Sequence, residues 1–194
     1  MKRSLTPRAE PPATFEVCIL TGGLSARMGR DKARLKLGGR TMLAIIRATA
    51  GQLKLPTRSV RRDLVARCGP LGGILTGLQT TRAEAVLFLA CDMPLVSAAL
   101  LKRCLRLSGA GVRAVFASQQ SRWGFPILLP ASALAVVERQ IVRQRLSVHE
   151  LAEAVRARKL RVPTQRRELF NINTPRDKAE AEPLLRRRAG RMTK

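Results

Sequence analysis

The chain has 194 residues, of which 45% are hydrophobic, so it fits one domain of ordinary size with a full core. It carries 37 lysines and arginines against 13 aspartates and glutamates, a formal net charge of +24. Such a charge favours polyanionic partners, nucleic acids among them. However, the arginines are spread over the whole length, and one tryptophan, five phenylalanines and no tyrosine offer few rings on which bases could stack. We therefore favour a solvated basic surface over a nucleic-acid partner.

The sequence has no apolar stretch of about 20 residues, so neither a membrane-spanning helix nor a membrane partner is expected. Residues 1–14 are basic, contain three prolines and lack the apolar run of a signal peptide, which predicts a disordered lead-in and a cytoplasmic protein. The four cysteines form no CxxC pair, and we interpret them as free, buried thiols. The one histidine, His149, lies in a helical pattern and is interpreted as a surface or packing residue.

In the first half of the chain, strands and helices are expected to alternate. Continuous apolar runs predict buried strands at 15–20 and 85–90. Thr41 and Ser97 can each cap a helix whose apolar residues follow at helical spacing. The stretch 57–68 is ambiguous, with one or two short strands around Val60 and Leu64-Val65. Helices are expected at about 42–53, 69–79 and 98–107.

The second half continues the alternation. A strand is expected at 112–117, and another at 124–129 that Pro126 would break or confine to an edge. Ser147 and Glu150 form a capping box, and Thr174, Pro175 and Asp177 mark the start of a last helix. The remaining expectations are helices at about 130–145 and 147–158, a strand at 160–162, and a frayed basic tail at 186–194.

This alternation predicts an α/β protein in three layers, a Rossmann-like fold with a mostly parallel central sheet. A single domain is expected over 15–185, between the lead-in and the tail. In such sheets, ligands bind outside the carboxyl ends of the strands. The loop after Leu20 and the aspartate Asp92, which follows the strand 85–90, both fall at that edge.

The stretch from Cys18 to Lys36, CILTGGLSARMGRDKARLK, runs from a strand into a glycine-rich, cationic loop. Glycines let backbone N–H groups approach phosphate oxygens, and Arg27 and Lys32 can neutralise different phosphates of one triphosphate. The stretch is neither a dinucleotide fingerprint nor a Walker P-loop. The alternative is a glycine turn with solvated charges.

Asp92 comes directly after a buried strand and before Pro94. A carboxylate there is a natural Mg²⁺ ligand that faces substrate phosphates, although it could instead cap the following helix. Asn171 and Asn173 precede the last helix, and in an extended backbone both amides lie on one side. They could bind a metal or a phosphate, or hold a turn. Cations, Mg²⁺ and positioning together suit phosphoryl or nucleotidyl transfer.

Four motifs, in this order, resemble those of the molybdenum cofactor guanylyltransferases. LTGGLSARMGRDKARL resembles LAGGxSxRMGxDKAxL, and GPLGGI from Gly69, ACDMP from Ala90 and FNINTP from Phe170 resemble GPLAGI, xCDMP and FxNxNTP. The resemblance implies a Rossmann-like fold of the nucleotide-diphospho-sugar transferase type. It also implies Mg²⁺-dependent transfer of GMP from GTP to the terminal phosphate of molybdopterin-bound molybdenum, which gives the guanine dinucleotide cofactor and pyrophosphate.

The match implies roles for individual residues. Arg27, Lys32 and Asp92 would be catalytic, and Asp92 would also hold the metal. Asn171 and Asn173 would bind the acceptor, while Asp63 would accept hydrogen bonds from guanine. The residues that would bind the nucleotide are Leu20, Thr21, Gly22, Gly23, Lys32, Asp63, Gly69, Pro70, Leu71, Gly73 and Asp92. Molybdenum-insertion proteins and molybdoenzyme chaperones are implied as protein partners.

The choice of base and acceptor has further clues. Gly22-Gly23 favours guanine, because cytidylyl relatives usually carry Ala-Gly there. Two stretches depart from the family: 55–68 is short and lacks an asparagine, and Trp123-Gly124-Phe125-Pro126 replaces Gln-Pro or His-Pro. The alternatives are therefore a nucleotidyltransferase for another phosphorylated acceptor or for CTP, and a non-catalytic basic binder of nucleotides or nucleic acids.

Overall fold

The structure, a computed structural model, describes residues 14–21, 35–65, 67–110 and 112–192. Its centre is a six-stranded sheet with the strand order β4-β1-β5-β7-β6-β8. β7 runs antiparallel to both of its neighbours, and the other five strands share one direction. The expected α/β fold with a mostly parallel sheet is thus confirmed. The six strands are β1 (Phe15–Leu20), β4 (Thr57–Val60), β5 (Ala85–Ala90), β6 (Val115–Gln119), β7 (Arg122–Pro130) and β8 (Arg158–Arg161); β2 (Lys36–Leu37) and β3 (Arg40–Thr41) form a separate pair.

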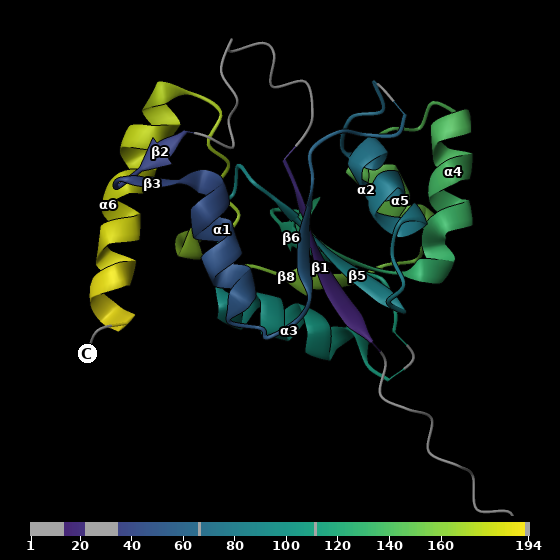
Figure 1. The fold of residues 1–194 in the computed structure, drawn as a ribbon, viewed down its shortest axis with the longest axis horizontal. Helices are drawn as coiled ribbons and strands as arrows, with labels where there is room; N and C mark the ends of the chain where they lie inside the picture. Colours follow the sequence, from purple (N-terminus) through teal and green to yellow (C-terminus); the bar gives the residue numbers. More distant parts are fainter. Residues whose placement is uncertain (1–13, 22–34, 66, 111, 193–194) are drawn as a thin grey trace, which may run out of the picture.

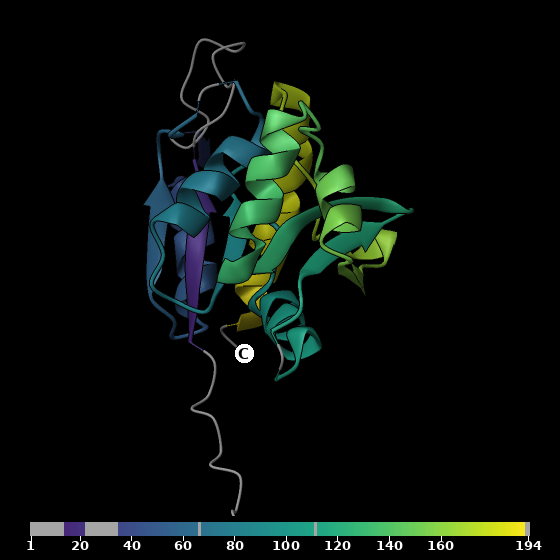
Figure 2. The ribbon, with the colours of Figure 1, turned by 90° about the vertical axis from the view of Figure 1, so that its right-hand side faces the viewer.

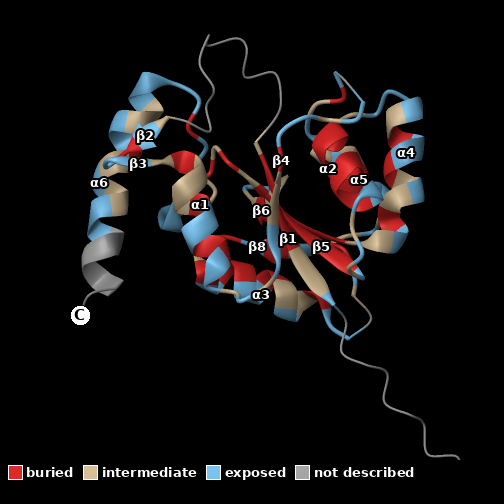
Figure 3. Ribbon diagram, in the orientation of Figure 1, coloured by how far each residue is buried: buried red, intermediate tan, exposed pale blue. Residues whose placement is uncertain are grey.

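Helices cover both faces of this sheet, which gives the expected three layers (Figure 1). Helices α1 (Met42–Gly51) and α3 (Ala98–Ser108) pack on one face. On the other face lie α2 (Pro70–Gln79), α4 (Leu134–Val142) and α5 (Val148–Ala154). Helix α6 (Pro175–Met192) packs beside β2 and β3. Figure 3 shows the buried residues concentrated in the sheet, and Figure 2 shows how strongly the sheet twists between β1 and the β6–β7 hairpin.

The burial of both sheet faces explains why β5 is apolar throughout and why β1 is apolar at every position except Glu16. In β1, Val17 and Ile19 pack in the cluster that includes α1 and α3, whereas Cys18 packs in the cluster that includes α2. This division follows from the alternation of side chains along a strand. Both strands are central, and the register pairs Leu20 with Ala90. The last residues of β1 and β5 therefore end at the same edge of the sheet.

The predicted helix caps are confirmed. The Thr41 hydroxyl accepts a hydrogen bond from the Ala44 amide at 3.1 Å, and Ser97 does the same for α3. A capping box of Ser147 and Glu150 begins α5. At α6, the Asp177 carboxylate accepts from the amides of Asn173 and Thr174, each at 2.8 Å. At α1, α3 and α5 a side-chain oxygen accepts from an amide that the helix itself leaves unpaired, whereas at α6 the carboxylate satisfies the two amides just before the helix.

The strand around Pro126 differs from the prediction of a short or edge strand. β7 is nine residues long and central, between β5 and β6. Its pairing with β6 shifts: Ile127 pairs with Phe116, but Gly124 pairs with Ala117, so Pro126 lies within an irregularity of the ladder. A proline is tolerated there because no ladder hydrogen bond requires its missing N–H. The amino-acid composition of the chain does not predict this bulge.

Several boundaries also differ. Pro130 ends β7 instead of starting a helix, and the short helix η3 (Ala131–Ala133) precedes α4, so the helix expected at 130–145 is wrong at both ends. Among the described residues of 57–68, which exclude residue 66, only β4 is a strand, and Leu64 is 63% exposed. β4 is the short strand expected around Val60. Another short helix, η4 (Thr164–Arg166), follows β8 in the chain.

Helix α6 continues to Met192 and so contains most of the expected tail 186–194, whereas the lead-in 1–13 lies outside the described residues.

All four cysteines are buried free thiols, as predicted. Burial raises the pKa of Cys18 to about 11 and that of Cys104 to about 12, which keeps both thiols protonated at neutral pH. His149 lies on the surface of α5 beside Glu153. Among the helices in the described ranges, none has the length and apolar character that crossing a membrane requires.

Candidate functional site

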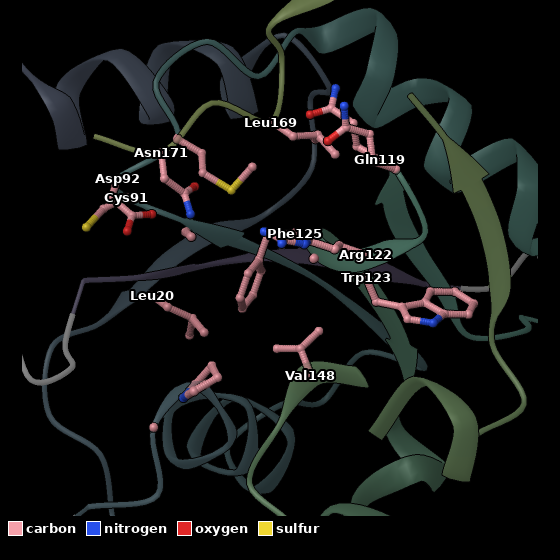
Figure 4. A pocket seen from close by; sticks show the side chains of 16 residues that line it. Leu20, Cys91, Asp92, Gln119, Arg122, Trp123, Phe125, Val148, Leu169 and Asn171 are labelled. Carbon is pink, nitrogen blue, oxygen red and sulfur yellow. The ribbon is translucent and has the colours of Figure 1, made fainter. Parts of the chain in front are cut away.

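A cavity of about 670 Å³ opens at the carboxyl edge of β1 and β5 (Figure 4). The ends of these strands form one wall, and the β6–β7 hairpin forms the opposite wall. A cavity of this size suits a small-molecule ligand. Its position is the one predicted from the parallel sheet. The residues that line it are Leu20, Gly69, Pro70, Ala90, Cys91, Asp92, Met93, Gln119, Gln120, Arg122, Trp123, Gly124, Phe125, Val148, Leu169 and Asn171.

The end of β1 is held firmly where the glycine-rich loop begins. The Thr21 amide and hydroxyl both donate to the Val60 carbonyl, at 3.0 and 2.9 Å. The Cys91 amide donates to the Leu20 carbonyl at 3.1 Å. The Thr21 hydroxyl therefore ties the end of β1 to β4. Of the two predicted nucleotide-binding residues Leu20 and Thr21, Leu20 lines the cavity and Thr21 does not. The predicted phosphate-binding residues Gly22, Gly23, Arg27 and Lys32 lie outside the described residues.

The N-terminus of α2 faces the same cavity. Gly69, with a φ of 55°, turns the chain into the helix, and Pro70 occupies the first helical turn. A left-handed φ favours glycine at this position. Gly69 and Pro70 line the cavity, whereas Leu71 is fully buried in the core. The unpaired amides of a helix N-terminus favour electron-rich ligands.

Asp63 packs against the first turn of α2 instead of lining the described cavity. A Cβ atom at Gly72 would lie 3.0 Å from an Asp63 carboxylate oxygen, and one at Gly73 would lie 3.1 Å from Leu20 Cδ2. The two glycines thus allow a neighbouring loop and a strand to approach the helix closely. The Leu64 amide donates to the Thr76 hydroxyl at 2.9 Å, which holds the loop on α2. Burial raises the pKa of the Asp63 carboxyl.

Asp92 and Asn171 lie together on one side of the cavity. The Asp92 backbone carbonyl accepts a hydrogen bond from the Ile172 amide at 2.8 Å, which joins the two segments. Figure 4 shows both polar side chains at that end of the cavity. Because Ser97 caps α3, Asp92 is not the cap of that helix. Asn173 is not a lining residue, and its backbone amide donates to the Asp177 carboxylate at the start of α6.

A buried carboxylate anchors the segment that carries Asn171. Glu168 is only 8% exposed, and its Oε1 accepts a hydrogen bond from the Ser97 hydroxyl. The same hydroxyl accepts from the Leu100 amide at 3.0 Å. Within the described residues, the Glu168 Oε2 atom has no hydrogen-bond partner. One serine therefore links the N-terminus of α3, where negative charge is favourable, to the chain that leads into the site.

Replacing that serine tests the anchor. We expect Ser97→Ala to lower the free energy of unfolding by about 2 kcal/mol, because an α3 amide and a buried carboxylate both lose their partner. The matched control is Ser147→Ala in the capping box of α5, whose Ser147 and Glu150 form an exposed pair. It should cost about 1 kcal/mol. Urea unfolding followed by circular dichroism measures both, and equal losses would contradict the proposed link to Glu168.

The sequence did not single out most of the opposite wall. Gln119, Gln120 and Arg122 belong to the hairpin, and Leu169 precedes Asn171. The only signal was that Trp123 and Phe125 lie in a stretch that departs from the expected motif. Arg122 is the one lysine or arginine among the lining residues that the structure describes, and Asp92 is their one carboxylate.

The donor set fits a hard divalent cation. Mg²⁺ in nucleotide enzymes is characteristically held by one or two carboxylates, and substrate phosphates and water complete its shell. The Asp92 carboxylate, with the Asn171 amide oxygen nearby, matches that pattern. Across the described parts of the chain, no group of three or more His, Cys, Asp or Glu side chains gathers as an all-protein metal site.

Comparison with known proteins agrees with this geometry. The family model of the MobA-like NTP transferase domain matches residues 17–60 and 48–160. A molybdenum cofactor guanylyltransferase from Pseudomonas putida is 32% identical over 190 residues, covering 87% of this chain and 97% of the relative. A probable molybdenum cofactor guanylyltransferase from Opitutus terrae is 31% identical over 183 residues, covering 82% and 91%.

Solved structures share the fold. Molybdopterin-guanine dinucleotide biosynthesis protein A from Archaeoglobus fulgidus superposes with a TM-score of 0.66 at 22% identity, covering 89% of this chain and 99% of that one. A 4-diphosphocytidyl-2C-methyl-D-erythritol synthase from Anaerococcus prevotii gives a TM-score of 0.70 at 15% identity, covering 90% and 99%. At such identities the likeness extends to the fold alone.

Proposed function

This chain belongs to the family of MobA-like NTP transferase domains and is a nucleotidyltransferase, and we propose that it transfers GMP from GTP to a molybdopterin-type molybdenum cofactor. The products would be the guanine dinucleotide cofactor and pyrophosphate. The observation that carries the proposal is the placement of Asp92 and Asn171 on one side of a cavity beside the N-terminus of α2. The names and near-complete coverage of the curated relatives support the cofactor as acceptor.

The nucleotide is proposed to bind on the side of the cavity formed by Leu20, Gly69 and Pro70. There the start of α2 offers unpaired amides to an electron-rich group. Arg27 and Lys32, which the first motif assigns to the triphosphate, would neutralise its phosphates from the adjoining loop. Asp63 is proposed to accept hydrogen bonds from the ring N–H and the amino group of guanine.

The reaction joins two phosphates. An oxygen of the acceptor phosphate attacks the α-phosphorus of GTP, the new P–O–P linkage forms, and the bond to the β-phosphate oxygen breaks as pyrophosphate leaves with the electron pair. The side chains mainly align these groups and offset the negative charge that builds between them. Asp92 would hold Mg²⁺, and Asn171 would orient the acceptor phosphate. Bound Mg²⁺ supplies Lewis-acid stabilisation of charge on the α-phosphate and on pyrophosphate.

Turnover with a panel of the four ribonucleoside triphosphates tests the proposal. With Mg²⁺ and molybdenum cofactor as acceptor, pyrophosphate release should require both substrates and should favour GTP by at least about tenfold in kcat/KM, the discrimination that one or two paired base edges provide. A preference for CTP would overturn the choice of base. Absence of turnover with every triphosphate, together with duplex binding that weakens steeply with salt, would favour the basic binder instead.

A further inference from the structure

Arg122 lies on the hairpin wall of the cavity, opposite the side where the nucleotide is proposed to bind. Leu20, Gly69 and Pro70 form the nucleotide side, and Arg122 comes from β7 on the other side. Figure 4 shows its side chain extending into the cavity near Phe125. Within the described residues, no carboxylate forms an ion pair with the Arg122 guanidinium. A cation of this kind, aimed into a ligand cavity, has its donors available for an anion.

The backbone beneath Arg122 is fixed by a tight turn. Gln119 pairs with Arg122 across the hairpin, and the two residues between them, Gln120 and Ser121, have φ values of 49° and 63°. Left-handed backbone at two residues that are not glycine is unfavourable and is characteristically found near functional sites. It also matches the twist of a two-residue hairpin. The turn therefore sets the direction in which Arg122 leaves the strand.

Contacts within the hairpin, and from β8 and the residues just after it, hold the hairpin in place. The Trp123 ring packs edge-on against Phe116, with centroids 6.1 Å apart, and the Lys159 ammonium lies 4.7 Å from the Trp123 centroid. The Gln119 side-chain amide donates to the Pro163 carbonyl at 3.2 Å. The Trp123 ring and the Gln119 side-chain amide are therefore engaged in contacts that stabilise the hairpin. The Arg122 guanidinium is the cationic group that the hairpin presents to the cavity.

We propose that Arg122 binds the phosphate of the acceptor and so selects a phosphorylated acceptor for this site. This inference rests on the proposed function. Two anionic phosphates must meet for the transfer, and the cations of the glycine-rich loop belong to the nucleotide. A planar guanidinium can hold two non-attacking oxygens of the acceptor phosphate at once, which leaves the third oxygen to attack the α-phosphorus. Arg122 thus offsets the repulsion between the acceptor phosphate and the triphosphate, and it does so from the wall opposite Asp92.

Steady-state kinetics separate this role from nucleotide binding. In Arg122→Ala, the KM for the molybdenum cofactor should rise about tenfold to a hundredfold, the value of a charge-assisted hydrogen-bonding pair, while the KM for GTP stays within about twofold. Arg122→Lys should recover part of the loss, because it restores the charge without the planar fork. The control Arg106→Ala removes an exposed arginine in the last turn of α3 and should change neither KM.

The single tryptophan of the chain gives a direct binding measurement. Trp123 is next to Arg122, so molybdenum cofactor added without GTP should change its fluorescence, after correction for absorption by the ligand. The midpoint of that titration should shift about tenfold or more in Arg122→Ala, with an unaltered melting temperature showing that the variant is folded.

The outcomes distinguish the inference from the function on which it rests. If wild-type protein turns over GTP and the acceptor midpoint is unchanged in Arg122→Ala, the inference is wrong and the proposed function stands. If instead the KM for GTP rises and that for the acceptor does not, Arg122 serves the nucleotide and the inference is also wrong. Failure of wild-type turnover refutes the proposed function, while the fluorescence titration still decides whether Arg122 binds a phosphorylated pterin.

Discussion

Asp92→Ala is expected to lower kcat by about a thousandfold or more, because the carboxylate proposed to hold Mg²⁺ against the triphosphate is removed. The hydrogen bond from Ile172 and the cap of the following helix should both survive the substitution. The Asp92 backbone carbonyl, not the side chain, accepts the hydrogen bond from Ile172, and Ser97 caps the helix that follows. Pyrophosphate release under saturating GTP and acceptor measures the effect, and a thermal melt by circular dichroism checks the fold.

The same strand supplies the control. Glu84 is an exposed carboxylate just before the amino end of β5, whereas Asp92 follows its carboxyl end. Glu84→Ala therefore makes the same charge change at the edge of the sheet that holds no proposed chemistry, and it should leave kcat within about twofold. Asp92→Asn keeps the shape and loses the charge, and it should need much more Mg²⁺ for half-maximal rate. Turnover by Asp92→Ala at the wild-type rate would remove Asp92 from the mechanism.

The sequence predicted this part of the site well, for a physical reason. The run 85–90 is short and apolar on both faces, which predicts a central, buried strand. Residues just past parallel strands meet at one edge, so the sequence alone places Asp92 beside the end of β1. Asn171 was expected there only through its motif, since a loop residue that follows no regular strand has no position that periodicity can fix.

The opposite wall could not be predicted in the same way. Pro126 correctly signalled an interruption, but sequence pattern cannot tell an edge strand from a bulge in a central one. Because β7 was taken as short and peripheral, Arg122 and the hairpin were not recognised as part of the cavity. The turn carries Gln120 and Ser121 in place of the usual glycine or asparagine, so it lacked the common hairpin signal. Tertiary contacts, not local preference, determine this wall.

A glycine near the C-terminal end of α2, Gly77, explains how closely this helix approaches the sheet. A Cβ atom at Gly77 would lie 2.3 Å from Phe88 Cε1, 2.9 Å from Phe88 Cζ and 3.3 Å from Cys18 Sγ. Phe88 and Cys18 belong to the central strands β5 and β1, and both are fully buried. Neither can swing into solvent. The Gly77 carbonyl also accepts a hydrogen bond of 2.6 Å from Arg58, which pairs with Glu16. The helix is thus held at this distance on two sides.

We expect Gly77→Ala to lower the free energy of unfolding by about 3 kcal/mol, the upper range for overpacking a tight core. This loss exceeds the gain of up to about 1 kcal/mol that alanine normally brings to a helix interior. Gly51→Ala is the matched control: it lies in the last turn of α1, its Cβ would meet no atom within 4 Å, and it should be neutral or slightly stabilising. Urea unfolding of both variants measures the difference.

A second substitution identifies the clash as the cause. Phe88→Leu alone leaves space beside Gly77, so it should destabilise by about 1 kcal/mol, whereas the double variant Gly77→Ala/Phe88→Leu should be more stable than Gly77→Ala alone. Such a non-additive cycle is expected only for side chains in contact. Additive losses would mean that α2 moves away from the sheet instead. That movement would displace Gly69 and Pro70 from the cavity, and the KM for GTP of Gly77→Ala would then rise while Asp92 stays in place.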